Sequence, residues 1–210
     1  MFNEQGKVKQ VSMINYPDDN YEELKMKAQK CERCHLRAKC RQVVMGEGNT
    51  RRKIMFIGEG PGGDEDRQGR PFVGRAGQLL NKIFSAVNIK RENIYISNIV
   101  KCRPPDNRVP TWDEMDACAP ILAAEIKIIE PKVIVPLGST ALKYLVDDNL
   151  AITRARGQWY NKGKLYFLPT FHPAYLLRNS NMKKYAWRDF KLIKKAIKRI
   201  DALKSSEKDL

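Results

Sequence analysis

Five cysteines provide the clearest chemical spacing in the chain. Cys31 and Cys34 form a C-x2-C pair, which can place two thiolates on one metal ion or cluster. A zinc ribbon would carry a second C-x2-C or a His pair farther along, and none follows. The remaining pair, Cys102 and Cys118, can converge with the first on one four-cysteine site of the kind that holds an iron–sulfur cluster. Cys40 is then the spare thiol.

Polar side chains that suit catalysis or binding follow three apolar runs: Glu59, Asn98 and His172. His172 lies between Phe171 and Pro173, and proline biases the residue before it toward an extended backbone. That restriction suits a side chain that must be aimed. Alternatives remain at this stage, because a lone histidine often has a structural role and an asparagine at a strand end can cap a turn.

A glycine-rich loop carries two further candidates, Glu59 and Phe72. It follows residues 54–57, an expected buried strand, and precedes residues 75–84, whose spacing is helical. Glycines allow a ligand to approach the backbone closely, so the loop predicts the floor of a pocket. Its glycine spacing matches neither the P-loop nor the dinucleotide fingerprint, and nucleotide binding is therefore not expected.

The elements that position these residues alternate between strand and helix. Further strands are expected at residues 93–100, 133–137 and 165–168, with helices at residues 112–129 and 139–146. This alternation predicts an α/β fold, a three-layer αβα sandwich with a central, mostly parallel four-stranded sheet. Such sheets bind ligands at the carboxyl ends of their strands, where the candidate residues lie.

The charge balance favours a polyanionic partner. Lys and Arg number 39 against 24 Asp and Glu, a net charge of +15, although a basic solvated surface is the alternative. The length of 210 residues favours one domain, with a helical segment at 1–30 and a basic helix and tail at 183–210. No apolar stretch approaches the ~20 residues that span a bilayer, and a cytoplasmic location without membrane contact is expected.

Together the motifs resemble the family 4 uracil-DNA glycosylases, the iron–sulfur branch of the uracil-DNA glycosylase superfamily. The resemblance covers nearly the whole chain, through CERC, GEGPGGDEDRQGRPFVGRAGQLL, ISNIVKCRPPDNRVPT, VIVPLGSTAL and FHPAYLLRN. It implies a peripheral [4Fe–4S] cluster whose ligands are Cys31, Cys34, Cys102 and Cys118. Two departures are Gly60, where alanine is common in the family, and Cys40, which has no counterpart among the ligands.

The resemblance also implies a DNA repair enzyme that flips uracil out of DNA and hydrolyses its N-glycosidic bond. Asn98 is expected to meet uracil O4 and N3–H, and Phe72 to stack on the base. His172 would donate to uracil O2 as negative charge forms there, while Glu59 and the Gly60 backbone would hold the attacking water. Phe72 as a plain core residue and Glu59 as a pocket wall are the alternatives.

DNA contacts are expected on two sides of the pocket. The segment from Tyr175 through Leu176 to Leu177 would wedge into the gap left by the flipped base, and three residues would meet phosphates: Arg103, Ser139 and Arg178. The acidic loop residues 64–66 are expected to be solvated or to cap the loop. Uracil-containing DNA is the only partner indicated, and a monomer is expected.

Two other classes of protein share some of these features. A non-catalytic iron–sulfur DNA-binding protein would keep the cysteines and the charge, but it would not need Glu59, Asn98 and His172 at three strand ends. A zinc-dependent nucleic-acid module, with His35 as a further ligand candidate, would differ in its visible absorption. A lone surface histidine is the simpler interpretation of His35.

Overall fold

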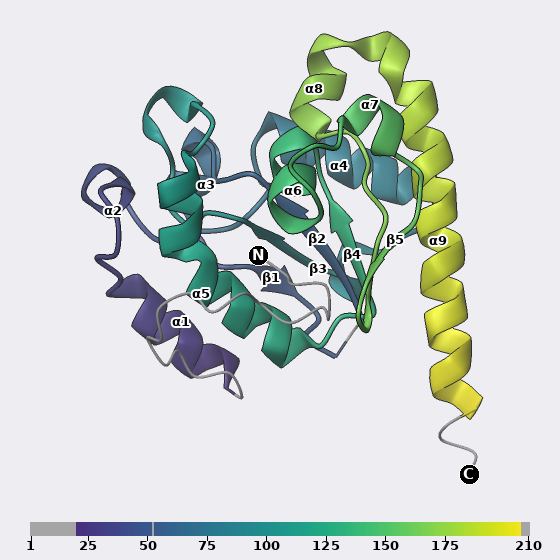
Figure 1. Cartoon of the computed structure of the whole chain (residues 1–210), viewed down its shortest axis with the longest axis horizontal. Coiled ribbons are helices and arrows are strands. Elements are labelled where there is room, and N and C mark those ends of the chain that lie inside the picture. The colour runs from purple at the N-terminus through teal and green to yellow at the C-terminus, as the bar shows by residue number, and fades with distance from the viewer. Residues whose placement is uncertain (1–19, 52, 207–210) are drawn as a thin grey trace.

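A six-stranded sheet forms the centre of the molecule (Figure 1). The computed structural model describes residues 20–51 and 53–206. The strands are β1 (Glu47–Gly48), β2 (Ile54–Gly58), β3 (Tyr95–Asn98), β4 (Val133–Pro136), β5 (Tyr160–Lys162) and β6 (Leu165–Phe167). They are ordered β1-β3-β2-β4-β6-β5, with four parallel strands in the middle and an antiparallel strand at each edge.

The predicted strand count of four is therefore wrong, although all four predicted strands exist and form the parallel centre. The two missed strands, β1 and β5, are only two and three residues long. Each lies half exposed at a sheet edge and is held by backbone pairing to its neighbour. Such a strand does not need an apolar run, and neither of these two has one. Hydrophobic periodicity carries no signal for such strands.

Nine α-helices connect and cover the strands in the described part of the chain. They are α1 (Tyr21–Gln29), α2 (Leu36–Lys39), α3 (Gly63–Gln68), α4 (Arg75–Ala86), α5 (Trp112–Ile129), α6 (Ser139–Leu145), α7 (Ile152–Ala155), α8 (Pro173–Arg178) and α9 (Lys183–Ser206). Short 3-10 turns occupy Arg91–Asn93, Pro105–Asn107 and Ser180–Met182. The helices predicted at 75–84, 112–129 and 139–146 are confirmed as α4, α5 and α6.

Two helices lie within the segments expected at the two ends of the chain. Helix α1 lies within the predicted segment 1–30, and α9 lies within 183–210; residues 1–19 and 207–210 of those predictions fall outside the described residues. None of the helices in the described ranges combines the length and the apolar character needed to cross a membrane.

Side-chain alternation along β2 divides the core between two layers. Met55 and Ile57 pack with α1, α5 and α6, whereas Ile54 and Phe56 pack with α4, α8 and α9. Figure 1 shows α1 and α5 on one side of the molecule and α9 running along the other. The predicted three-layer arrangement is thus present in the structure.

Helix α9 packs on the sheet through one apolar stripe, as its amphipathic pattern predicts. Phe190 and Ile193 are fully buried, and Ile197 packs against the same core. Trp187 is 38% exposed and lies at the margin of this stripe.

Candidate active site

The carboxyl ends of β2 and β3 bring two predicted pocket residues together. Gly58, the last residue of β2, pairs with Asn98, the last residue of β3. A Cβ atom on Gly58 would lie 2.5 Å from Asn98 Oδ1 and 2.5 Å from Phe72 Cζ. Real Cβ atoms do not approach so closely, so glycine is required for the amide of Asn98 and the ring of Phe72 to meet here.

The side chain of Asn98 has a buried polar atom without a partner among the described residues. Its residue is 2% exposed, and its Oδ1 atom accepts no hydrogen bond within the part of the chain that the structure describes. A buried polar atom left unsatisfied is costly, and in a native fold it often marks a functional position. The amide is therefore available to a ligand that supplies a donor.

His172 lies at the start of α8, beyond the carboxyl end of β6. The Ala174 amide donates to His172 Nδ1 at 3.1 Å, so a neutral ring carries its proton on Nε2. Burial, and then the charge of Arg178, lowers the pKa of His172 to about 4, which keeps the ring neutral at neutral pH. The ring centroids of His172 and Phe72 are 5.8 Å apart.

Two further contacts fix the position of His172. Gly138 has a φ of 91°, and a Cβ atom there would lie 2.8 Å from His172 Cβ, so glycine is needed for this close approach. On the other side, Thr170 Oγ1 donates to Asp189 Oδ2 of α9 at 2.7 Å. Arg156 Nε donates to the same Asp189 oxygen at 2.9 Å. The segment leading to the histidine is thereby tied to the end of β4 and to α9.

Glu59 accepts a hydrogen bond from a residue to which the sequence analysis gave no role. Thr140 Oγ1 donates to Glu59 Oε2 at 2.5 Å, which leaves the second carboxylate oxygen free of this contact. Burial raises the pKa of Glu59, and the bond from Thr140 opposes that rise. The only sequence signal for Thr140 was its place just after β4, beside Ser139.

The backbone at Gly60, the residue after Glu59, is closely covered. A Cβ on Gly60 would lie 2.8 Å from Val100 Cγ2, so alanine would require Val100 to move.

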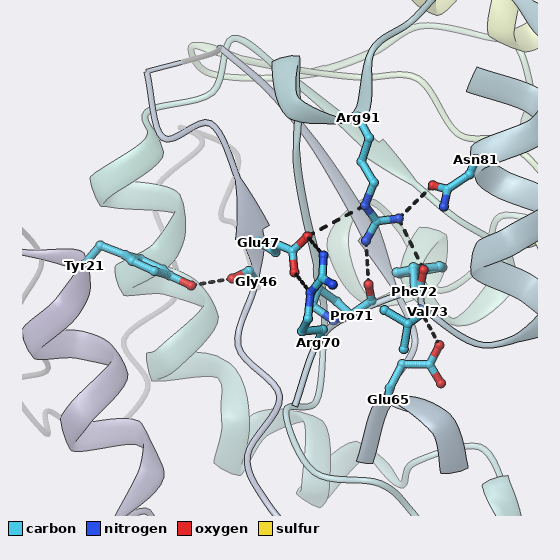
Figure 2. Close-up of polar contacts among 10 residues, drawn as sticks. All are labelled: Tyr21, Gly46, Glu47, Glu65, Arg70, Pro71, Phe72, Val73, Asn81 and Arg91. Carbon is cyan, nitrogen blue, oxygen red and sulfur yellow. Dashed lines mark hydrogen bonds and ion pairs between the residues drawn. The ribbon is translucent and has the colours of Figure 1, made fainter. Parts of the chain in front are cut away.

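Phe72 adopts a backbone conformation that bulky residues rarely take. Its φ is 54°, in the left-handed region, and its side chain is buried. Figure 2 shows Arg91 pointing into the loop that contains Phe72. Arg91 Nη2 donates to Pro71 O at 2.6 Å, and Arg91 Nη1 donates to Phe72 O at 3.2 Å. Glu65 Oε1 accepts from Val73 N at 2.9 Å, just past the ring.

The loop contacts extend to the sheet edge. Arg91 Nη1 also donates to Asn81 Oδ1 at 2.9 Å, and Arg91 Nε lies 3.9 Å from Glu47 Oε1 in β1. Glu47 in turn accepts two hydrogen bonds from Arg70, at 2.7 and 2.8 Å. Of the acidic residues 64–66, Glu65 caps the loop as predicted, but Glu65 and Asp66 are buried rather than solvated. Arg91 was not among the predicted residues, because its contacts are with carbonyls about 20 residues away in the chain.

The residues predicted to contact DNA differ in how exposed they are. Ser139 and Arg178 are exposed, Tyr175 is half-buried, and Arg103 donates through Nε to Asn107 Oδ1 at 2.9 Å. Leu176 is fully buried in the core, which corrects its assignment to a DNA-contacting surface. A helix turns successive side chains about 100° apart, so its neighbour Leu177 is the one that points outward, at 41% exposure.

The predicted cluster ligands line one cavity, and Cys40 is absent from its wall. The cavity is bounded by the segment between α1 and α2, by α2, by α5 and by the segment after β3, and its thiols are Cys31, Cys34, Cys102 and Cys118. Lys101 N donates to Cys118 Sγ at 3.3 Å. Cys40 lies beside the site, with its Sγ atom 3.6 Å from Arg37 O and a side-chain hydrogen bond to Cys102.

The four thiols are the donor set that a [4Fe–4S] cluster takes. Across residues 20–51 and 53–206, no three Cys, His, Asp or Glu side chains are grouped as ligands of one metal ion. Four thiolates around one zinc would share a centre at about 2.3 Å, whereas in a [4Fe–4S] cluster each binds its own iron. Burial raises the pKa of Cys118 to about 12, so a cationic group is needed to hold it as a thiolate. His35 takes no part, because its Nε2 lies 2.6 Å from Glu114 Oε1.

Comparison with known proteins agrees with this geometry. Residues 45–191 match the model of the Uracil DNA glycosylase superfamily. A type-4 uracil-DNA glycosylase of Thermotoga maritima is 48% identical over 179 residues, 82% of this chain and 92% of that protein. One from Sulfurisphaera tokodaii is 42% identical over 185 residues, 84% of each. A type-5 uracil-DNA glycosylase of Pyrobaculum aerophilum is 30% identical over 152 residues, 63% of this chain and 66% of that protein.

The chain therefore belongs to the uracil DNA glycosylase superfamily, and within it to the type-4 group. The higher identity and wider coverage of the type-4 relatives separate it from the type-5 protein.

Proposed function

We propose that this protein removes uracil from DNA by flipping the nucleotide into the pocket and hydrolysing its N-glycosidic bond. The products are free uracil and an abasic site, which other repair enzymes then process. The observation that carries this proposal is the buried Oδ1 atom of Asn98, which has no hydrogen-bond partner among the described residues and lies close to Gly58, as does the Phe72 ring. The names of the type-4 relatives point to the same activity.

Recognition of the base follows from the Asn98 amide. Uracil offers a donor at N3 and an acceptor at O4, so N3–H can donate to the unpaired Oδ1 atom while the amide nitrogen donates to O4. Cytosine has the opposite pattern at both atoms and would leave the buried amide unsatisfied. The Phe72 ring, fixed by its clamped loop, supplies a flat surface for stacking.

Bond cleavage leaves negative charge on uracil O2, and His172 is the donor for it. With Nδ1 occupied by the Ala174 amide, the neutral ring can donate only through Nε2–H. A lowered pKa is favourable here, because a neutral donor costs no proton and is ready throughout the neutral range. The hydrogen bond strengthens as charge grows on the base, which lowers the energy of the transition state more than that of bound DNA.

The attacking water is assigned to Glu59 and the Gly60 backbone. Glu59 is held by Thr140 at one oxygen, so the other can orient the water toward the cation-like sugar carbon. Its raised pKa brings the carboxylate closer to the working pH, which makes it a stronger base than a solvated one.

The four-cysteine cavity is assigned to a [4Fe–4S] cluster with a structural role. Four thiolates saturate such a cluster and leave no position for substrate. Bound DNA would contact the exposed and half-buried residues around the pocket: Arg103, Ser139, Tyr175, Leu177 and Arg178. A single-domain monomer suffices for this activity.

A duplex oligonucleotide with one uracil tests the proposal. Incubation followed by alkali should cleave the strand at the uracil, while a matched duplex with cytosine stays intact. Asn98→Asp replaces the amide donor by an acceptor, and we expect uracil excision at saturating enzyme to fall at least tenfold. An inactive wild-type protein would contradict the proposal, whereas full activity of Asn98→Asp would remove Asn98 from the pocket. A non-catalytic DNA-binding protein, the rival, would bind this DNA without releasing uracil.

A further inference from the structure

A buried lysine connects the cysteine cavity to the strand end that carries Asn98. Lys101 and Glu125 of α5 are both fully buried, and Lys101 Nζ lies 2.6 Å from Glu125 Oε2. The same ammonium donates to Ser97 Oγ at 2.6 Å and to the backbone carbonyl of Asn98 at 2.7 Å. All three donors of the lysine are therefore used.

Glu125 is satisfied in the same way. Its Oε1 atom accepts from Gly46 N at 2.8 Å and from Tyr95 Oη at 3.0 Å, and its Oε2 atom also accepts from Ser97 Oγ at 2.8 Å. A buried ion pair of this kind adds little net stability compared with apolar residues of the same volume. A fully bonded network does, however, fix one geometry, which points to a role in positioning.

Asn98 is the residue that this geometry controls. Its side-chain oxygen has no partner among the described residues, so no side-chain acceptor contact anchors the amide before a base arrives. Its backbone carbonyl is held by Lys101 Nζ instead. On the far side, the Lys101 amide donates to Cys118 Sγ, and Lys101 directly precedes Cys102. One residue thus touches both the cysteine cavity and the base-reading strand end.

We propose that Lys101 and Glu125 are positioning residues that hold Asn98 in register with the uracil edge. The proposal rests on the proposed function of the pocket. Through the Lys101 backbone, the packing of the cysteine site also sets where Asn98 lies. The Lys101–Glu125 pair accordingly serves base recognition, and its contribution to stability can be separated from that role.

Removing the two charges singly and then together separates the effect on stability from the effect on base recognition. Lys101→Met and Glu125→Gln each leave one buried charge without its partner, and we expect each to lower the Tm by about 10 °C or more. The double variant holds neither charge, and its glutamine can still accept from Gly46 and Tyr95, so most of the Tm should return. The Asn98 carbonyl still lacks its donor in the double variant. Its single-turnover uracil excision should therefore remain about 10- to 100-fold below wild type.

Affinity and a control variant complete the test. Binding to an undamaged duplex should stay within about twofold of wild type in the double variant, and rates are compared at equal iron content. Tyr95→Phe removes a different hydrogen bond to Glu125 without touching Lys101 or Asn98, and it should keep the wild-type rate.

Two results would overturn the inference. If the double variant regains the wild-type excision rate together with its Tm, the pair is only structural, and the proposed function stands. If the wild-type protein excises no uracil, the proposed function fails and this inference fails with it.

Discussion

Individual side chains in this pocket have their protonation states set by burial. His172 is kept neutral by a pKa lowered to about 4, whereas the pKa of Glu59 is raised above its ordinary 4.5. The two side chains therefore titrate at different pH values. The histidine stays a neutral donor at neutral and mildly acidic pH, and the Glu59 carboxylate is the group that gains a proton first as the pH falls.

The rate–pH profile follows from these directions. Glu59 is active as the carboxylate, so single-turnover excision should fall as the pH drops through its raised pKa, above 4.5. His172 does not gain a proton until about pH 4, so it should not shape this acid limb. We expect the limb to persist in His172→Gln at a lower overall rate and to disappear in Glu59→Gln. Persistence of the limb in Glu59→Gln would assign it to another group.

At the scale of elements, the loop after β2 stores strain that its neighbours offset. Phe72 has a φ of 54°, and a bulky residue there costs of order 1–3 kcal/mol. The Arg91 fork on the Pro71 and Phe72 carbonyls and the Glu65 carboxylate on the Val73 amide hold the loop from two sides. The ring is thus held in the connection between two elements by contacts within the protein.

Arg91→Lys should loosen that ring. Lysine keeps the charge but has no planar fork, so it cannot hold both carbonyls in the same geometry. We expect uracil excision to fall about tenfold while affinity for undamaged duplex stays unchanged. Arg70→Lys is the matched control, because Arg70 also pairs with Glu47 but makes no recorded contact with the loop carbonyls. Equal losses in both variants would point to Glu47 and away from Phe72.

The cysteine cavity joins the segment between α1 and α2, together with α2 and α5, to the segment after β3. Cys102→Ala removes one thiol of its wall and should lower iron content, visible absorption and Tm together, because a cluster binds to the folded form. Cys40→Ala is the control, since Cys40 contacts Cys102 but does not line the cavity. Loss of iron in Cys40→Ala would show that the ligand set is wrong.

The whole molecule carries +15, and this charge acts on binding more than on cleavage. Contacts between basic side chains and phosphates release counterions, which makes affinity fall steeply with salt. Asn98 and Phe72 are buried and Glu59 and His172 are half-buried, so salt should affect their chemistry less than it affects binding. Affinity and catalysis should therefore respond to different substitutions.

Two variants separate these properties. Arg178 is exposed beside the pocket, so Arg178→Ala should weaken duplex binding and flatten its log–log salt slope by about 0.9, one phosphate contact. His172→Ala should keep affinity and lower the saturated single-turnover rate by about 10²–10³. Both quantities are measured at two salt concentrations. If His172→Ala loses affinity and keeps its rate, the histidine positions DNA and another donor serves the leaving base.

The four parallel strands at the centre of the sheet could be predicted from the sequence, because buried strands such as β2 are continuous apolar runs. The candidate residues Glu59, Asn98 and His172 were picked out by their places at or after strand ends, and the family resemblance assigned their expected roles. Three kinds of feature became visible only in the structure: the edge strands β1 and β5, the core position of Leu176, and the supporting contacts of Thr140, Arg91 and Lys101. Those features depend on residues distant in the chain, as between Lys101 and Glu125 or Thr140 and Glu59, and hydrogen bonds of that kind leave no periodic trace in a sequence.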